Sequence, residues 1–345
     1  MPRVTPERLT EVVIEVLKGL GAGPDEAPVV AESLVRAEMR GTDTHGLPYL
    51  KLLVERAEAG MVSLPTRVTT VMDDGATVLL DGGNGIGQFA GWTAMGVSIR
   101  KAREHGIGLT LVRHTNNLGF LAFYTLQAAS QGFVGLTMGN ANAAMPPWGG
   151  AEAFFGTNPI SLAVPGSPAP VALDMSSSLV ARGKIRRAQR LGEKIPLGWA
   201  LDESGMPTED PGAALKGTLV PIGGPKGYGL ALMVDVLAGM LSGAAFGRDI
   251  KSFHQLTGPT EVGALTLAID IQRFMPLDRF RGLMEGYAES IRRSRKAKGT
   301  ARIYLPGEIE AEKERTSRER GIELRPASLE MVNQFLEKLR SPVRL

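Results

Sequence analysis

The spacing of apolar residues changes near residue 66, and this change constrains the fold more than any other feature of the chain. Before it, apolar residues recur at the three- and four-residue intervals of amphipathic helices, which we expect over about 6–20, 24–40 and 47–59. After it, short apolar runs alternate with helical stretches. Such alternation is typical of α/β folds, in which helices cover a sheet.

The α/β part and the segments that follow it can be divided further. Short strands are expected at 68–72, 77–80, 109–112, 134–138, 160–164, 171–174 and 265–269, and helices at 90–105, 120–131, 278–296 and 328–340. The Asp73-Asp74-Gly75 turn favours a hairpin between the first two strands. Residues 182–225, rich in Gly, Pro and charge, predict a long and partly irregular excursion, and 226–241 predict a buried helix.

Length and composition bound the class of protein. A chain of 345 residues with 43% hydrophobic content can bury a large core, and its length favours two domains. No apolar run reaches the roughly 18 residues of a membrane span, and residues 1–5 lack the apolar centre of a signal peptide, so we expect a cytoplasmic protein without membrane contact. Cysteine is absent, which excludes disulfides and cysteine metal sites; no metal site is expected.

The charge balance gives little reason to expect a nucleic-acid partner. The formal net charge is only +3. The dense basic run at 292–298 has no interleaved aromatic residues and precedes an acidic stretch that begins at Glu308. We interpret both as solvated surface.

Glycine-rich runs mark three loops that could lie close to a ligand. Gly85–Ala90 fits the dinucleotide fingerprint, but no acidic residue ends a second strand about 20 residues later. Gly223–Gly229 opens the predicted helix at 226–241 and would direct free N–H groups and Lys226 at an anion; the alternative is a tight helix entry with Lys226 in solvent. The third run, Gly149–Asn158, precedes the strands that end near Asp174.

His45 is the residue that most suggests catalysis. It is one of four histidines, and it lies in Gly41-Thr42-Asp43-Thr44-His45-Gly46, where a helical pattern breaks into a turn. Imidazole titrates near neutral pH, so His45 beside Asp43 is a candidate acid or base. A capping or core-edge histidine explains the hexapeptide equally well.

Six motifs together resemble a known family. They are the His45 hexapeptide, Pro147-Trp148-Gly149-Gly150, Phe155-Gly156-Thr157-Asn158-Pro159, Asp174-Met175-Ser176, Ala181-Arg182-Gly183-Lys184 and Gly224-Pro225-Lys226-Gly227-Tyr228-Gly229-Leu230. In this order they are similar to type 2 malate/L-lactate dehydrogenases, a group that also includes sulfolactate, ureidoglycolate and 2,3-diketogulonate oxidoreductases and a cyclic imino-acid reductase. The resemblance extends from the first helix to Pro306-Gly307-Glu308.

The resemblance implies a nicotinamide-dependent oxidoreductase with a non-Rossmann fold. A helical domain would be built from both chain ends, 1–70 and 285–345, and an α/β NAD(P)-binding domain at 71–284 would be inserted in it. The family also implies a homodimer that completes the sites. NAD and NADP both remain open as cofactor, because no ribose-reading acid or 2′-phosphate arginine can be recognised.

The cofactor site implied by the resemblance does not use the glycine run at 85–90. The cofactor should lie along Ser176, along the start of the helix at 226–241 and along a turn at Gly263-Ala264, with the strand end near Asn140 approaching the nicotinamide. The full set of expected cofactor-binding residues is Asn140, Asn142, Thr157, Asn158, Asp174, Ser176, Lys226, Gly227, Tyr228, Gly263 and Ala264.

The chain departs from the family at two polar positions. The family usually has His shortly before Gly119, where this chain has Asn117, and often has Arg three residues after the His-Gly pair, where this chain has Tyr49. An amide does not titrate, and a phenol offers no bidentate cation, so neither residue can replace its counterpart.

The resulting hypothesis is reversible hydride transfer between NAD(P)H and a small 2-oxo acid. His45 would donate the proton to the carbonyl oxygen and Asp43 would orient it. Lys184 and Arg182 are the best remaining cations for the substrate carboxylate, Tyr49 and Asn117 would border the substrate, and His114 could substitute for the missing imidazole. Two alternatives remain: a cyclic imino-acid reductase of the same family, and a cofactor-binding paralogue with little or no catalysis.

Overall fold

The N-terminal part of the chain is helical. The computed structural model describes residues 2–345, except for the side chain of Asp43. Its first helices are α1 (Pro6–Gly19), α2 (Glu26–Arg40) and α3 (Leu47–Glu58), followed by sheet strands after residue 66 as the apolar spacing predicts. The Thr5 side chain accepts a hydrogen bond from the backbone N–H of Arg8 and so caps α1. The three predicted helices are confirmed.

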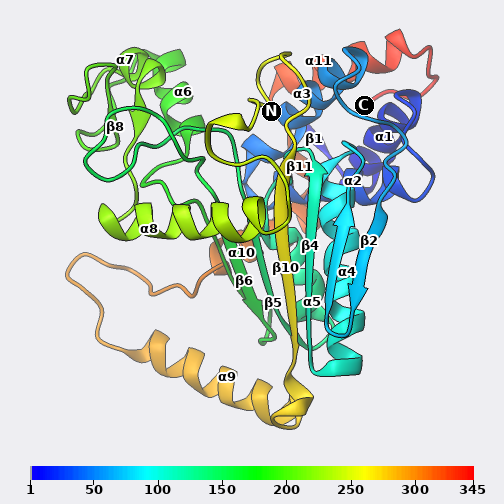
Figure 1. Cartoon of the computed structure of the whole chain (residues 1–345), viewed down its shortest axis with the longest axis vertical. Coiled ribbons are helices and arrows are strands. Elements are labelled where there is room, and N and C mark those ends of the chain that lie inside the picture. The colour runs from blue at the N-terminus through cyan, green and yellow to red at the C-terminus, as the bar shows by residue number, and fades with distance from the viewer. Residues whose placement is uncertain (1) are drawn as a thin grey trace.

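Both ends of the chain meet in one apolar core. The last helix, α11 (Pro326–Lys338), contributes Val332 and Leu336 to the buried cluster that also holds Leu9 and Leu34. A short antiparallel pair joins β1 (Arg3–Val4) to β11 (Ile322–Glu323). The N- and C-termini consequently lie on the same side of the molecule (Figure 1).

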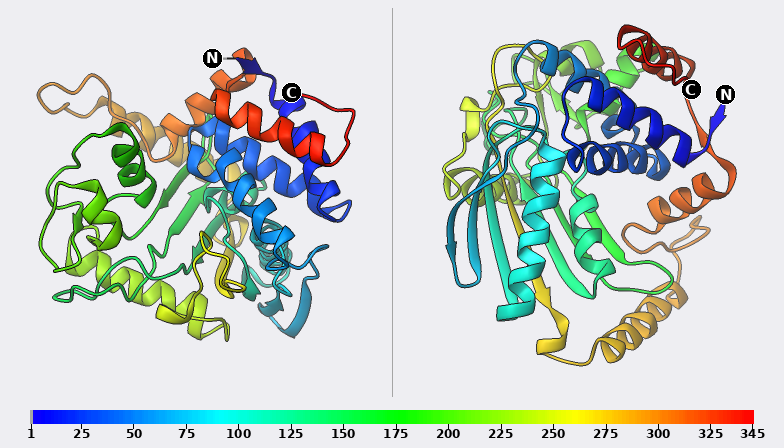
Figure 2. Two further views of the ribbon diagram at one scale, coloured as in Figure 1. Left: turned by 90° about the horizontal axis from the view of Figure 1, so that it is seen from above. Right: turned by 90° about the vertical axis from the view of Figure 1, so that its right-hand side faces the viewer.

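Within residues 2–345, a seven-stranded mixed sheet forms the centre of the molecule (Figures 1 and 2). Its strands, in spatial order, are β2 (Thr69–Asp74), β3 (Thr77–Asp81), β4 (Ile107–Thr115), β10 (Val262–Asp270), β5 (Phe133–Gly139), β6 (Ile160–Val164) and β7 (Val171–Met175). β3 and β4 run parallel, and the other neighbouring pairs are antiparallel. The predicted strands and the hairpin at Gly75 are confirmed, and the sheet is not the parallel sheet of a Rossmann domain.

Helices cover both faces of this sheet. α4 (Gly87–His105) connects β3 to β4, and together with α5 (Ala122–Ser130) it buries a large apolar cluster that includes Met95 and Phe123. α8 (Pro225–Val234) crosses the opposite face (Figure 1) and continues as a π-helix, η2 (Asp235–Met240), which contacts β10 and β5.

Two predictions for residues 182–241 need correction. The expected irregular excursion contains α6 (Arg182–Leu191), β8 (Ala200–Leu201), α7 (Pro211–Lys216) and β9 (Thr218–Leu219). These elements pack in a buried cluster that also includes Met145, Phe155 and Ala231. The helix expected at 226–241 is present, but the prediction that it is buried is wrong for one of its faces, because Met233 and Met240 remain 52% and 46% exposed. Apolar composition alone could not distinguish a helix buried all round from a helix with an uncovered apolar face.

The remaining segments complete the chain. They are η1 (Asp43–His45), η3 (Gly247–Asp249), η4 (Ile271–Arg273), α9 (Leu277–Arg293) and α10 (Glu308–Arg320). α10 was not predicted, because its mostly charged residues were interpreted as an acidic surface stretch. No helix in the described part of the chain is long and apolar enough to cross a membrane.

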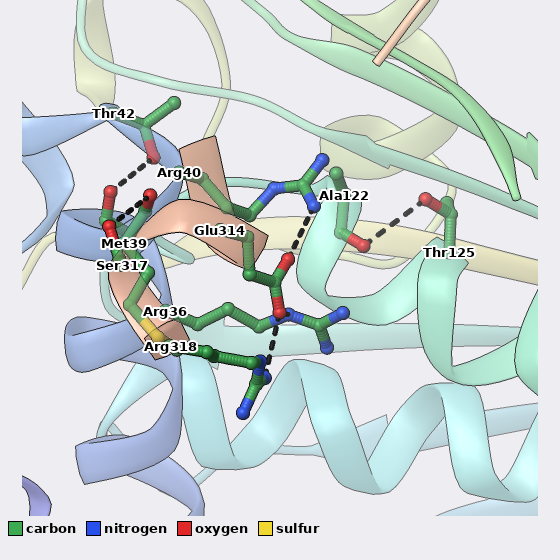
Figure 3. A network of polar contacts seen from close by, with 10 residues as sticks. Arg36, Met39, Arg40, Thr42, Ala122, Thr125, Glu314, Ser317 and Arg318 are labelled. Carbon is green, nitrogen blue, oxygen red and sulfur yellow. Dashed lines mark hydrogen bonds and ion pairs between the residues drawn. The ribbon is translucent and has the colours of Figure 1, made fainter. Parts of the chain in front are cut away.

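A buried carboxylate joins α10 to α2 (Figure 3). Glu314 lies 3.1 Å from Arg36 Nε, 2.7 Å from Arg40 Nη1 and 2.9 Å from Arg318 Nη2. Burial would raise the pKa of Glu314, but the charge of Arg36 and the hydrogen bonds from Arg318 and Arg40 bring it below its ordinary value. Beside this network, the Ser317 hydroxyl donates to the Met39 carbonyl at 3.2 Å. The C-terminal segment is thereby fixed to the last turns of α2.

Glu314→Gln should lower the free energy of unfolding by about 3 kcal/mol, because it leaves largely buried arginines without a counter-charge. The folded-state pKa of Glu314 is depressed, so its contribution is present above the ordinary glutamate pKa of 4.5 and is lost as pH falls through the depressed value. Urea unfolding at neutral and acidic pH measures this difference. The exposed Glu319→Gln on the same helix is the control and should change stability by less than about 0.5 kcal/mol. Equal effects of the two variants would contradict the interpretation.

Candidate active site

The His45 turn is held by the end of α2. Gly41 ends that helix in the left-handed conformation, with φ 73°, and η1 then leads into α3. The Glu38 carboxylate accepts a hydrogen bond from the backbone N–H of Leu47 at 2.7 Å, which anchors the start of α3 to α2. The turn that carries His45 is therefore fixed on both sides.

His45 itself is a neutral imidazole at pH 7. Its Nδ1 lies 3.0 Å from the Thr44 hydroxyl, and its side chain is half-buried. Desolvation by the surrounding protein lowers its pKa to about 4, because burial disfavours the charged ring. Asp43, the predicted orienting residue, has a side chain outside the described part of the structure.

The start of α6 packs directly against this turn. A Cβ atom on Gly183 would lie 2.8 Å from Thr44 Cγ2, which is closer than two carbon atoms normally approach. The two segments therefore pack this closely because residue 183 has no side chain. This contact places the start of α6, which carries the predicted residues Arg182 and Lys184, beside the turn that carries His45. Arg182 is half-buried and donates to the Leu215 carbonyl at 2.5 Å, whereas Lys184 is exposed.

Tyr49 and Asn117, the two departures from the family pattern, contact each other. The Tyr49 hydroxyl donates to the Asn117 carbonyl at 2.9 Å, and the Tyr49 ring stacks on Phe253 with centroids 4.8 Å apart. Burial raises the pKa of Tyr49, so the phenol stays protonated. The Asn117 side chain accepts from the backbone N–H of Gly119 at 2.9 Å and so shapes its own loop.

Gln88 was not among the predicted site residues, because it appeared only within the glycine run at 85–90. It is fully buried near Tyr49, yet its amide atoms make no well-formed hydrogen bond with the described residues.

The glycine run at 85–90 itself serves packing. The backbone N–H of Ile86 donates to Thr66 Oγ1 at 2.7 Å, and a Cβ on Gly87 would lie 2.3 Å from the Asn117 carbonyl oxygen. These contacts cover the start of α4, as expected if the run is not a dinucleotide loop.

His114 pairs with a carboxylate at the end of β3. Its Nδ1 lies 2.9 Å from Asp81 Oδ2, and Arg113 contacts the same oxygen at 3.1 Å. His114 also has a left-handed backbone, with φ 50°. None of the contacts described for His114 reaches the His45 turn, and its catalytic role stays a prediction.

Two of the predicted cofactor residues brace the ends of strands. Asn140 donates to Asp235 Oδ1 at 3.0 Å and accepts from the backbone N–H of Gly263 at 2.9 Å. Asn158 donates to the Ala231 carbonyl at 2.8 Å and accepts from the backbone N–H of Ala141. Their side chains are thus engaged by the protein itself, and they fix the loops that follow β5 and precede β6.

The other predicted cofactor residues surround these strand ends and the start of α8. The Thr157 carbonyl accepts from Ser177, Ser176 Oγ lies 2.9 Å from Ser178 Oγ, and the Tyr228 ring meets Phe155 edge-on. Asn142 is half-buried after β5, and Lys226 and Gly227 lie in the first turn of α8.

The prediction of a turn at Gly263-Ala264 is wrong. Both residues lie in β10, where their backbone pairs with the end of β5.

Asp174 links the end of β7 to the start of α5. Its carboxylate accepts from the backbone N–H of Ala122 at 2.8 Å, and burial raises its pKa to about 6 although Arg40 opposes the shift. Burial raises the pKa of Tyr124, and the charges of Tyr49 and Asp174 raise it further. Among the side chains that the structure describes, no group of three or more His, Asp or Glu is arranged to hold a metal ion.

Comparison with known proteins identifies the family. Residues 4–333 match the family model described as malate/L-lactate dehydrogenase. The chain belongs to this family. It is 38% identical to the malate dehydrogenase of Pyrococcus abyssi over 314 residues, which cover 89% of this chain and 86% of that protein. The structure of the sulfolactate dehydrogenase from Methanocaldococcus jannaschii superposes with a TM-score of 0.93 at 33% identity, covering 99% of this chain and 98% of that one.

These matches confirm the predicted family and its mixed α/β fold. They also confirm the prediction of a dehydrogenase of 2-hydroxy acids. Both NAD(+)- and NADP(+)-dependent enzymes occur among the named relatives, which supports the predicted nicotinamide cofactor at family level.

Gly183→Ala should displace the His45 turn, since the added Cβ would lie 2.8 Å from Thr44 Cγ2. We expect the pKa of His45 to move from about 4 toward its ordinary value of 6.5, because the displaced ring becomes better hydrated. A histidine-resolved NMR titration measures this directly in a chain with four histidines. Gly282→Ala, at a position on α9 with open space around it, is the control. An unchanged His45 titration in the first variant would show that the α6 contact does not control the ring.

Proposed function

We propose that this protein transfers hydride reversibly between NAD(P)H and a small 2-oxo acid of the malate or L-lactate type, with His45 as the acid and base at the carbonyl oxygen. The observation that carries this proposal is the place of His45. It is a desolvated, neutral imidazole on a fixed turn, and the cationic start of α6 packs against that turn. A ketone accepts hydride only when charge on its oxygen is neutralised, and this arrangement would place a ring that can exchange the proton beside cations that can bind the substrate carboxylate.

The start of α8 fits the phosphates of a nicotinamide cofactor. Gly224 caps this helix without a side-chain hydrogen bond, so the first backbone N–H groups and Lys226 can meet an anion. When bound, the cofactor would supply or accept the hydride at the substrate carbon. Of the remaining predicted contacts, Asn142, Thr157, Ser176, Gly227 and Tyr228 would border the same region, and Asn140, Asn158, Gly263 and Ala264 would shape it. Asp174, which binds the start of α5, would contribute only from the other face of the sheet.

The low pKa of His45 sets the order of proton movements. In the oxidation of a hydroxy acid, the neutral ring is ready to accept the hydroxyl proton. In reduction the ring must first be protonated, and an anionic substrate beside it favours the charged form. Lys184 and Arg182 would bind the substrate carboxylate next to the reacting carbonyl, and Asp43 would orient the His45 ring. Tyr49 and Asn117 would border the substrate without adding charge.

The domain arrangement and the assembly are parts of the same proposal. Two large buried clusters, one made by both chain ends and one by the sheet with α4 and α5, support a helical domain of 1–70 and 285–345 around an α/β domain of 71–284. Exposed apolar residues on α9 and on the outer strands support a homodimer. These residues are Leu162, Leu173, Leu283 and Tyr287. The cytoplasmic location stays a prediction.

His45→Ala should reduce turnover by about 10²-fold or more and leave NAD(P)H binding intact. In the wild type, kcat/KM for hydroxy-acid oxidation should rise through about pH 4 and stay level to pH 8, since the free enzyme already holds a neutral ring. NAD(P)H oxidation and its reverse, assayed with pyruvate, oxaloacetate and a cyclic imino acid, measure both effects. His105→Ala, at the exposed end of α4, is the control.

The same assays separate the alternatives. Unchanged turnover in His45→Ala would refute the proposed role of His45. Turnover of the imino acid alone would indicate a reductase of C=N bonds, and cofactor binding without turnover of any substrate would indicate a paralogue without catalysis.

Leu283→Glu should convert the proposed dimer to monomers, because Leu283 and Tyr287 are 56% and 66% exposed in the single chain and would be covered by a partner. Analytical ultracentrifugation of both proteins measures this change. Glu285→Lys alters charge on the same helix outside the apolar stripe and serves as the control. A monomeric wild type would contradict the proposed assembly.

A further inference from the structure

The loop at 116–119, which follows β4, is anchored by hydroxyl groups from two helices. The Tyr49 hydroxyl, on α3, donates to the Asn117 carbonyl at 2.9 Å. The Tyr124 hydroxyl, on α5, donates to the Leu118 carbonyl. Both tyrosines are buried, so the loop is tied to the interior of the molecule and its position depends on where these two phenols lie.

Gln88, in the first turn of α4, packs against the same loop. Its side chain is fully buried. A Cβ atom on Gly119, which has a left-handed backbone with φ 68°, would lie only 3.2 Å from Gln88 Nε2. The amide also lies near Tyr49, because burial raises the pKa of that phenol while Gln88 and the charge of Arg56 oppose the rise. Gln88 therefore borders both the loop and one of the phenols that anchor it.

The amide of Gln88 is not satisfied by the protein around it. Neither its Nε2 nor its Oε1 has a hydrogen-bond partner among residues 2–345. A buried amide without partners destabilises the folded state, whereas an apolar side chain of the same shape carries no such cost. Groups that lower stability in this way are often kept because a function needs them.

A small movement would join Gln88 to the hydrogen bond between Tyr49 and Asn117. The Tyr49 oxygen already donates its proton to the Asn117 carbonyl, and its lone pairs can accept from an amide N–H. Tyr49 and Asn117 are also the residues that would border the substrate in the proposed function. We infer that Gln88 is a positioning residue, whose amide donates to the Tyr49 hydroxyl when the substrate is bound and so fixes Tyr49 and the 116–119 loop beside it. This inference rests on the proposed function and adds a residue that acts through Tyr49 without touching the substrate.

Gln88→Met tests the inference, because it keeps the length of the side chain and removes the amide. The urea midpoint of the ligand-free protein should rise, since two unpartnered polar atoms leave the core. At the same time kcat/KM for the 2-oxo acid should fall about tenfold or more, because the groups beside the substrate are no longer held in place. The KM for NAD(P)H should stay unchanged. Urea unfolding and NAD(P)H oxidation with oxaloacetate and pyruvate measure these effects, whereas a merely structural role would lower stability and activity together.

Gln127→Met is the matched control. Gln127, on α5, also has a buried Oε1 without a partner in the described part of the chain, but its Nε2 lies near Gly96 of α4. The same chemical change there should leave kcat/KM at the wild-type value.

A double-mutant cycle with Tyr49→Phe tests whether Gln88 acts through the phenol. The two substitutions together should lower kcat/KM no more than the larger of the single effects, because both remove the same hydrogen bond. Additive losses would show that Gln88 does not act through Tyr49.

The remaining outcomes separate the possible failures. A lower urea midpoint in Gln88→Met would show that the amide has a partner in the folded protein, such as a bound water, and would overturn the inference. Unchanged kcat/KM with an active wild type would overturn it and leave the proposed function intact. A raised KM for NAD(P)H alone would assign the amide to the cofactor and also overturn it. If the wild type reduces neither oxaloacetate nor pyruvate, the proposed function fails and the inference fails with it.

Discussion

The buried carboxylate of Glu314 is the interaction on which the placement of the site depends. It binds arginines from the last turns of α2, and those turns hold the His45 loop through Glu38 and the backbone of Leu47. The charge of Arg40, one of the partners of Glu314, also opposes the rise that burial causes in the pKa of Asp174 at the end of β7. One carboxylate on a C-terminal helix thereby couples the N-terminal helices to the edge of the sheet.

The secondary structure could be predicted wherever the local pattern had one explanation. α1 repeats its apolar residues on one face and has a capping threonine followed by proline, so its limits were predictable. α10 lacks that pattern, because the residue it buries is charged and is stabilised by arginines about 280 positions earlier in the chain. Gly263-Ala264 has the composition of a turn, yet hydrogen bonds from β4 and β5 on either side keep it in a strand. Local sequence does not contain those distant partners.

The same distinction applies to the site. His45, Arg182 and Lys184 could be proposed because each belongs to a short motif. Gln88 gave no such signal, because its place beside Tyr49 comes from a contact between segments far apart in sequence. Tyr49 leaves the start of α3 without a cation, whereas several cations lie on α6. The uncharged residue at Tyr49 is thus best interpreted together with the charges on α6.

The contact at Gly183 has a consequence for the spacing of the site. Residues 182–219 pack in a small buried cluster together with Met145 and Phe155, and their contact with Thr44, the neighbour of His45, is made by a residue with no side chain. The distance between the His45 turn and α6 therefore depends on how large a side chain position 183 can accommodate. A substitution at this position would change the spacing between the His45 turn and α6 without altering a titratable side chain on either segment.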